Sequence, residues 1–315
     1  MRRSRDRSSL LPRIDLDTAL EAMDAEDLRE AVREVLLELD ERAHARVVTS
    51  LMGRAARGDS AWTPAAIREQ DVAEVLSFVK AARRVGYADP CDVDGYLHRG
   101  VGAFLGKHYD AAHKIFGALL QPIAEAAIDL GQHELVEEVL GVDVAECAAQ
   151  YVVTTYMTAD PGERAEAVRA AIREMSDVTY FFEPIRMMEA VAVEPLPGLD
   201  DFLGGWRAIV ARETPGGRGG SWDSDADRWL REVVHRMEGV EGLAKLARSS
   251  RRADDLHAWC DGLVAARNWR DALPAFEEAA AIVTDKTHGR GEFLDGAALA
   301  AQELGKKDLS PWLER

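Results

Sequence analysis

The chain has 315 residues, of which 47% are apolar, and its 56 acidic and 39 basic side chains give a net charge of −17 at pH 7. This apolar content suffices for a buried core and excludes a disordered chain, while no run approaches the ~20 apolar residues that a membrane span requires. A protein with this much negative charge repels the phosphate backbone of nucleic acids, which argues against nucleic acid as the main partner.

The N-terminal segment 1–13 is basic, unlike the rest of the chain. It holds five arginines and a single acid, Asp6. We interpret it as a flexible arm, because chain termini are usually solvated. The alternative is an arm that contacts nucleic acid or an acidic partner, chiefly through Arg2, Arg3, Arg5 and Arg7. Leu10-Leu11 is too short for the apolar core of a secretory leader, so we expect a cytoplasmic protein.

After the arm, the chain carries the start and stop signals of helices of ordinary length. Asp24 and Asp40 are predicted to cap two successive helices, the second of which should end near Gly58. Thr63-Pro64 predicts the next start, because a hydroxyl suits the cap and proline suits the first helical position. Gly86 is predicted to end that helix in the left-handed conformation.

The middle of the chain continues in the same way. Asp143 and Asp160-Pro161 predict two more helix starts. The run 194–198 contains two prolines and a glycine and is interpreted as an extended loop. Asp200 or Asp201 is then predicted to cap the helix that follows.

Two segments, 151–156 and 178–182, have the β-branched and aromatic composition of strands. Neither has a partner strand, and no hairpin turn is signalled nearby. An isolated pair of strands would be marginal in any case. We therefore interpret both segments as buried turns of helices, and the predicted fold class is all-α.

Residues 214–221 contain four glycines and one proline, a composition too flexible for a packed element. We interpret this segment as a linker. The predicted organisation has four parts, namely a basic arm at 1–13, an N-terminal helical array at 14–213, the linker at 214–221 and a C-terminal helical region at 222–315.

Two stretches, 96–119 and 256–279, share one internal spacing. In each, a large apolar residue is followed after four positions by a small one, after nine more by an aromatic, then by alanine after three and phenylalanine after four. The positions are Tyr96, Gly100, Tyr109, Ala112 and Phe116 in the first stretch and Leu256, Cys260, Trp269, Ala272 and Phe276 in the second. This pattern resembles the tetratricopeptide repeat, a family of antiparallel helix hairpins.

The resemblance implies hairpins that stack as an α-solenoid, because one pair of helices cannot bury its own apolar face. It places the small residue where the two helices come closest, and it places Phe116 and Phe276 in the gap to the next hairpin. A third, shorter unit starts near Phe293. Its end would need cover from further chain or another subunit over Leu299, Leu304, Leu309 and Trp312. The match covers only part of the chain, and a generic α-solenoid or an irregular helical domain is the alternative.

No motif for catalysis, a cofactor or a metal is found. The run 100–107 lacks the spacing and the hydroxyl of a phosphate-binding loop, and the run 89–95 would place Pro90 and Val101 at calcium-ligand positions. The eight histidines form no HExxH pair. Three widely spaced cysteines offer neither a disulfide framework nor a paired metal ligand, namely Cys91, Cys147 and Cys260. We therefore predict no cofactor, no metal and no enzymatic activity.

We predict an adaptor or regulatory scaffold that binds a peptide or a partner protein. The resemblance implies a groove lined by the first helix of each hairpin, which nominates Leu97, Val101, Phe104, His257, Asp261 and Val264. A core role is the alternative for the first three. Two other functions stay open. One is an enzyme with a dispersed site in a helical cleft, which perturbed titratable groups in a pocket would favour. The other is a subunit of a nucleic-acid-associated complex that uses the arginine arm.

Overall fold

The computed structural model describes residues 16–57, 64, 66–131, 135–214, 223–283 and 289–313. Within these ranges the chain is helical and contains no strand; Tyr87 and Asp129 form an isolated bridge. The helices are α1 (Leu16–Ala22), α2 (Ala25–Glu38), α3 (Glu41–Arg57), α4 (Glu69–Val85), α5 (Pro90–Leu105), α6 (Tyr109–Ala124), α7 (Val136–Val139), α8 (Val144–Thr158), α9 (Arg164–Glu174), α10 (Pro184–Val191), α11 (Leu199–Glu213), α12 (Asp225–Ser250), α13 (Ala253–Ala265), α14 (Trp269–Ile282), α15 (Gly289–Glu303) and α16 (Ser310–Leu313). The predicted all-α class is confirmed.

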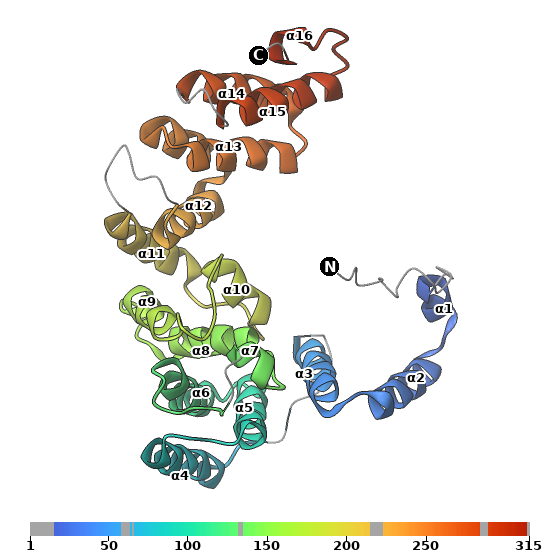
Figure 1. The fold of residues 1–315 in the computed structure, drawn as a ribbon, viewed down its shortest axis with the longest axis vertical. Coiled ribbons are helices and arrows are strands. Elements are labelled where there is room, and N and C mark those ends of the chain that lie inside the picture. Colours follow the sequence, from blue (N-terminus) through green and yellow to red (C-terminus); the bar gives the residue numbers. More distant parts are fainter. Residues whose placement is uncertain are drawn as a thin grey trace.

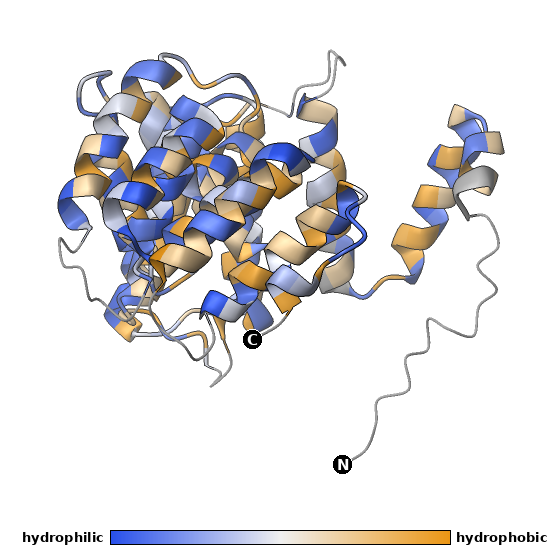
Figure 2. Cartoon of the chain, turned by 90° about the horizontal axis from the view of Figure 1, so that it is seen from above, coloured by the Kyte–Doolittle hydropathy of each residue, from blue (hydrophilic) through white to orange (hydrophobic). Residues whose placement is uncertain are grey.

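From α4 to α16 the helices stack roughly in chain order along the long axis of the molecule (Figure 1). Neighbours in the stack contact one another, as in the pairs α5–α6, α8–α9, α11–α12 and α13–α14. Of the first three helices, α3 packs on α5 of this stack, whereas α1 and α2 lie apart from the stack (Figure 2). The protein therefore has an elongated helical body and a separate N-terminal extension.

Several predicted helix boundaries are confirmed. The side chain of Asp24 accepts hydrogen bonds from the backbone N–H groups of the first turn of α2, and Asp40 does the same for α3. Asp143 caps α8 through the N–H of residue 146. Gly86 ends α4 with φ = 78°, the left-handed conformation that glycine adopts at little cost.

Three predicted starts are wrong. Pro64 is not helical, and α4 begins five residues later after Arg68, whose backbone N–H and guanidinium both donate to Asp71. After Asp160-Pro161 the chain makes a turn before α9 begins. The N-cap of α11 is Gly198 in the left-handed conformation, so Asp200 and Asp201 lie in the first turn instead, where their charges favour the helix dipole.

The two segments of strand-like composition have different structures. Residues 151–156 are buried within α8, as predicted. Residues 178–182 form an irregular loop, so the helical interpretation of this segment is wrong. Pro184 starts α10 immediately afterwards, and a residue before proline avoids the helical region, which is why Glu183 has φ = −130° and ψ = 81°.

The buried side chains form two cores that meet inside α12. Trp229 and Val233 belong to the first core, and Val234 and Leu243 belong to the second. Further along α12, between Val234 and Leu243 of the second core, Gly239 has φ = 63° and ψ = −155°, a conformation that is almost restricted to glycine, and α12 bends there. The predicted linker lies outside the described residues except for Thr214. The two cores therefore share α12, which follows the predicted linker in the sequence.

The two stretches of similar spacing form two hairpins with the same turn. Lys107 and Arg267 occupy equivalent positions with φ of 60° and 51°. The next residue in each turn, His108 or Asn268, donates its N–H to a carbonyl five positions earlier at 2.9 Å. The second helix then begins at the aromatic residue of the pattern in both cases. The sequence alignment of these hairpins is thus in the correct register.

Side-chain packing in the hairpins agrees with the predicted role of Phe276, whereas the place of Phe116 in the gap to the next hairpin stays a prediction. The ring of Tyr109 meets Phe104 of the first helix edge-on, with the ring centroids 5.9 Å apart. Gly100 is buried against Phe116, whose ring leaves no room for a Cβ atom. Phe276 reaches across to Gly296 of α15, which confirms that it fills the gap to the next helix.

The last unit consists of α15 and the single turn α16. Trp312 is buried on the second core and donates its indole N–H to Glu277 at 2.9 Å, so the prediction that this residue lacks cover is wrong. Leu309 packs on the same core. Leu299 and Leu304 are exposed, as predicted.

Candidate functional site

A groove of about 560 Å³ opens between the loop that precedes α10, the first half of α12, and α13. It brings together residues from three parts of the sequence. Two of the predicted binding residues, His257 and Asp261, lie in it. The lining consists of Phe182, Glu183, Asp223, Arg228, Arg231, Glu232, His235, Leu243, Asp254, His257, Ala258, Asp261, Gly262 and Ala265.

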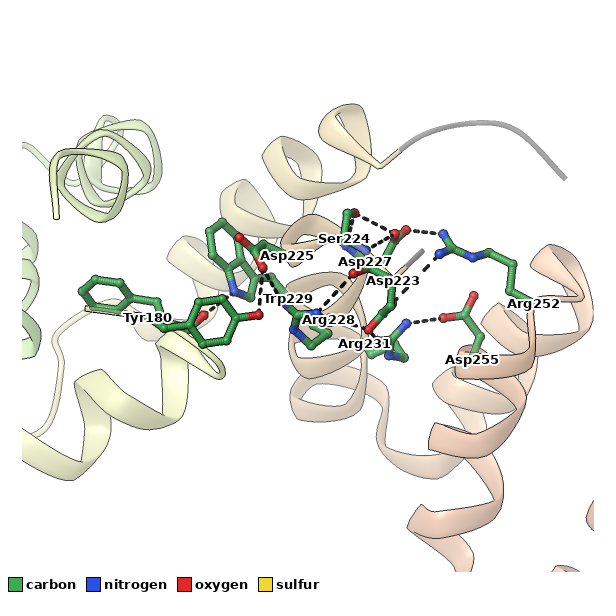
Figure 3. A network of polar contacts seen from close by, with 11 residues as sticks. Tyr180, Asp223, Ser224, Asp225, Asp227, Arg228, Trp229, Arg231, Arg252 and Asp255 are labelled. Atoms are coloured by element: carbon green, nitrogen blue, oxygen red, sulfur yellow. Dashed lines mark hydrogen bonds and ion pairs between the residues drawn. The ribbon is translucent and has the colours of Figure 1, made fainter. Parts of the chain in front are cut away.

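A network of buried ion pairs holds the walls of the groove together (Figure 3). Arg231 of α12 donates to Asp223 at 2.5 Å and to Asp255 of α13 at 2.8 Å. Burial opposes the charge of Arg231, but hydrogen bonds to the two carboxylates raise its pKa above the ordinary value. Arg252, at the start of α13, also donates to Asp227 of α12. The network therefore fixes the start of α12 against the start of α13.

The other wall, the loop at 178–183, is tied to α12 by aromatic side chains. Trp229 donates its indole N–H to the carbonyl of Phe181 at 2.8 Å, and the hydroxyl of Tyr180 donates to Asp225 at 2.9 Å. The guanidinium of Arg228 lies 5.4 Å from the ring centre of Phe182, within the range of a cation–π contact. This irregular loop is thus held as one wall of the groove.

Unpaired polar atoms concentrate at this groove. Five buried side-chain nitrogen or oxygen atoms in the described part of the chain have no hydrogen-bond partner, and three of the five belong to groove residues. They are Oδ1 of Asp223, Nε of Arg228 and Oε2 of Glu232. Of these, Oδ1 of Asp223 lies 4.0 Å from the guanidinium of Arg252, an ion-pair distance without a hydrogen bond. Because buried polar atoms in folded proteins are nearly always paired, such a concentration indicates a place where a polar ligand or water binds.

The groove is acidic. Its lining contains five carboxylates and two arginines. Both arginines are already paired, Arg228 with Asp223 and Arg231 with Asp255. Asp254 and Asp261 form no hydrogen bond or ion pair with any other described side chain. The free charge that faces a ligand is therefore negative.

Glu232 combines burial with a structural contact. Its Oε1 accepts the backbone N–H of Arg186 at 2.8 Å and so caps the start of α10. Burial raises the pKa of Glu232 to about 7, because desolvation outweighs the backbone hydrogen bonds that favour the ionised form. A glutamate of this kind in a pocket meets part of the criterion for a dispersed active site. Its capping contact explains its position without a catalytic role.

We expect the stability of the protein to fall as the pH rises through 7 because of Glu232. A folded-state pKa of about 7 against 4.5 in the unfolded chain means that the folded state holds the proton more tightly. The resulting stabilisation is complete below pH 4.5 and is lost as the pH passes 7. Glu232→Gln keeps the capping oxygen and removes this titration. Between pH 5 and pH 8 the free energy of unfolding of the wild type should fall by about 1–3 kcal/mol more than that of the variant.

Urea unfolding at pH 5, 6, 7 and 8 measures this difference. Glu241→Gln, which removes an exposed carboxylate from the same helix, is the control and should follow the wild type. If the wild type and Glu232→Gln respond to pH in parallel, Glu232 does not titrate in this range.

The remaining nominated residues have other positions. Leu97, Val101 and Phe104 are buried in the first core, so their nomination as partner-binding residues is wrong and the core alternative holds. Their helix faces other helices on the side where an open groove was expected. Val264 packs against the second core and is half-buried. His257 is stacked on Phe293 at 4.1 Å between ring centres, with Glu292 3.2 Å from its Nε2.

Most groove residues carry no recognisable signal in the sequence. Arg231 and Glu232 come from a helix that matches no repeat motif, Asp223 lies just before that helix, and Phe182 comes from a loop that was predicted as helix. Their one visible signal is the density of charge in residues 223–232, where three aspartates and a glutamate alternate with arginines and tryptophan. Such a pattern is also typical of solvated helices, and therefore does not distinguish a site.

No group of three or more histidine, cysteine or acidic side chains in the described ranges has the arrangement of a metal site. No helix in these ranges is both long enough and apolar enough to cross a membrane. Burial raises the pKa of Cys260 to about 12 and that of Cys147 well above its ordinary value, so both stay protonated thiols at neutral pH.

Comparisons of the chain with protein-family models, with curated proteins and with solved structures gave no match.

Proposed function

We propose that the protein is an interaction module that binds a basic segment of a partner polypeptide in the groove between α12 and α13. The observation that carries the proposal is the meeting, in one groove, of unpaired buried polar atoms and free carboxylates. Lysine and arginine side chains supply the positive charge and the hydrogen-bond donors that these groups lack.

An extended peptide also fits the other contacts that the groove offers. Arg228 Nε needs an acceptor, which a backbone carbonyl provides. The exposed ring of Phe182 offers apolar surface to the aliphatic part of a lysine or arginine. Stacked hairpins that resemble tetratricopeptide repeats are a scaffold suited to such extended ligands. An adaptor that recognises basic segments follows from this combination.

We expect Asp254→Asn combined with Asp261→Asn to weaken the binding of a fluorescein-labelled hexa-arginine peptide by about tenfold, which corresponds to ~1.4 kcal/mol. Both substitutions keep the shape of the side chain and remove its charge. Neither carboxylate takes part in the ion-pair network. Fluorescence anisotropy at physiological ionic strength measures the affinity.

A matched control separates the groove from the general attraction of an acidic protein. Asp200→Asn combined with Asp201→Asn removes the same charge from the exposed first turn of α11 and should leave the affinity within about twofold. Equal weakening by both pairs of substitutions would show that the peptide responds only to net charge, and the proposed site would be wrong. A hexa-glutamate peptide should not bind.

A further inference from the structure

The N-terminal helix α2 carries an apolar stripe that the rest of the described chain leaves uncovered. Leu28, Val32, Val35 and Leu39 follow one another at spacings of four, three and four, which places them on one side of the helix. None of the residues of α2 is buried, and Val35 is 57% exposed. Figure 2 shows this helix apart from the body. An apolar stripe of this kind is usually covered in the functional state of a protein.

The next helix, α3, has one face on the body and another face outward. Its inner face includes Thr49, whose hydroxyl lies 3.3 Å from Nδ1 of His98 on α5, and Met52, which packs on the first core. Val47 and Leu51 lie on the opposite side of the helix by their spacing from Thr49. Leu51 is 39% exposed. Thus α3 also presents an incompletely covered apolar strip.

The connection between these helices keeps the two apolar surfaces apart within one chain. Only Leu39 and Asp40 separate α2 from α3. Leu39 has an extended backbone, with φ = −81° and ψ = 145°, and Asp40 caps α3, so α2 leads away from α3 (Figure 1). A short connection between two helices that have complementary faces favours exchange of the helix between two copies of a chain.

The charges of the two helices are complementary. By sequence, α2 contains five carboxylates and two arginines, for a net charge of −3. α3 contains one glutamate and four arginines, for a net charge of +3. Two α2 helices would repel each other, and the acidic α2 is also repelled by an anionic membrane surface. Arg46 faces the body, where it donates to the carbonyl of Gly141, whereas Arg54 is exposed and follows Leu51 by three positions, on the outer side of α3. The outer face of α3 therefore offers the acidic α2 an apolar strip with a basic side chain beside it.

We propose that two copies of this chain form a dimer in which α2 of each copy packs on the outer face of α3 of the other. The contact is reciprocal, which is the arrangement that a two-fold axis generates. It covers both apolar strips and pairs the acidic helix with the basic one, twice in each dimer. The groove between α12 and α13 takes no part in this contact, so the dimer does not rest on the proposed peptide binding.

Light scattering coupled to size-exclusion chromatography tests the dimer on the full chain. At high micromolar concentration the wild type should have twice the single-chain mass of 34.6 kDa. On dilution its mass should fall towards that of the single chain. Val35→Glu and Leu51→Glu should each give the single-chain mass at all concentrations. Leu37→Glu is the control, because Leu37 is 85% exposed and lies opposite the stripe; it should dimerise like the wild type. Circular dichroism confirms that each variant keeps its helical content.

A longer connection provides a second test that does not depend on disrupting a surface. Insertion of the four residues Gly-Ser-Gly-Ser between Leu39 and Asp40 should let α2 fold back on its own α3. The protein should then have the single-chain mass and an unchanged helix content. A wild-type protein that has the single-chain mass at every concentration would overturn the proposal. A dimer that survives both Leu51→Glu and the insertion would also overturn it, since its contact would then lie elsewhere.

Disulfide trapping identifies which helices meet. In a Cys91→Ser background, an equimolar mixture of Val35→Cys chains and Leu51→Cys chains should form mixed disulfide dimers on mild oxidation. Cys147 and Cys260 are buried and should not react. If Val35→Cys chains cross-link with themselves and not with Leu51→Cys chains, α2 pairs with α2, and the exchanged arrangement is wrong.

Discussion

Replacing Arg231 with alanine is expected to lower the free energy of unfolding by about 3–5 kcal/mol, because it leaves the buried carboxylate of Asp255 without its partner. Arg231 is the only described residue that bridges Asp223 and Asp255, and the side chain of Asp255 is only 6% exposed. An uncompensated charge in such a place is far more costly than a lost surface contact. Urea unfolding followed by far-UV circular dichroism measures the change.

Two further variants show whether burial is the cause. Arg83→Ala removes an exposed pair with Glu125, 3.1 Å long, and should cost at most about 1 kcal/mol. Arg231→Met combined with Asp255→Leu removes both charges of one pair and should be more stable than Arg231→Ala alone. If Arg231→Ala and Arg83→Ala cost the same, the network does not hold α12 on α13.

The local features of this fold were largely predictable because they depend on residues close in sequence. A cap such as Asp143 acts on the N–H group three residues later, and a left-handed end such as Gly86 needs only the freedom of one glycine. The turn shared by the two hairpins is equally local, so the alignment of Tyr109 with Trp269 gave the correct register. The helix start predicted from Thr63-Pro64 was wrong at Pro64, because the capping contact of Arg68 with Asp71 competes for the start of α4.

The candidate site was mostly beyond prediction because it depends on contacts between distant residues. Arg231 and Asp255 are 24 positions apart, and Trp229 meets Phe181 across 48. No periodicity in one sequence reports which of 56 acids pairs with which arginine. The prediction of a partner-binding role was wrong for a related reason at Leu97, Val101 and Phe104. An apolar residue on the first helix of a hairpin suits a groove and a core equally, and only the packing of neighbouring helices decides between them.

We expect Gly296→Ala to lower the free energy of unfolding by about 1–3 kcal/mol, although alanine is the better helix former. A Cβ atom at this position would lie 2.3 Å from Cε1 of Phe276, closer than two carbon atoms can approach. Phe276 is buried between α14 and α15, so its ring has little room to move. The clash should therefore force the two helices apart and strain the second core.

Matched variants connect this cost to the contact of Gly296 with Phe276. Gly95→Ala adds a Cβ atom to the exposed side of α5, where no atom lies within 4 Å, and should stabilise the protein by about 0.5–1 kcal/mol. Phe276→Leu shortens the opposing side chain, so adding Gly296→Ala to it should cost less than adding Gly296→Ala to the wild type. Calorimetric unfolding of the wild type, the three single variants and the double variant measures the cost of Gly296→Ala in both backgrounds and the effect of Gly95→Ala. Equal costs of Gly296→Ala in the two backgrounds would mean that Phe276 does not set the spacing of α14 and α15, and its predicted role between successive repeat units would be lost.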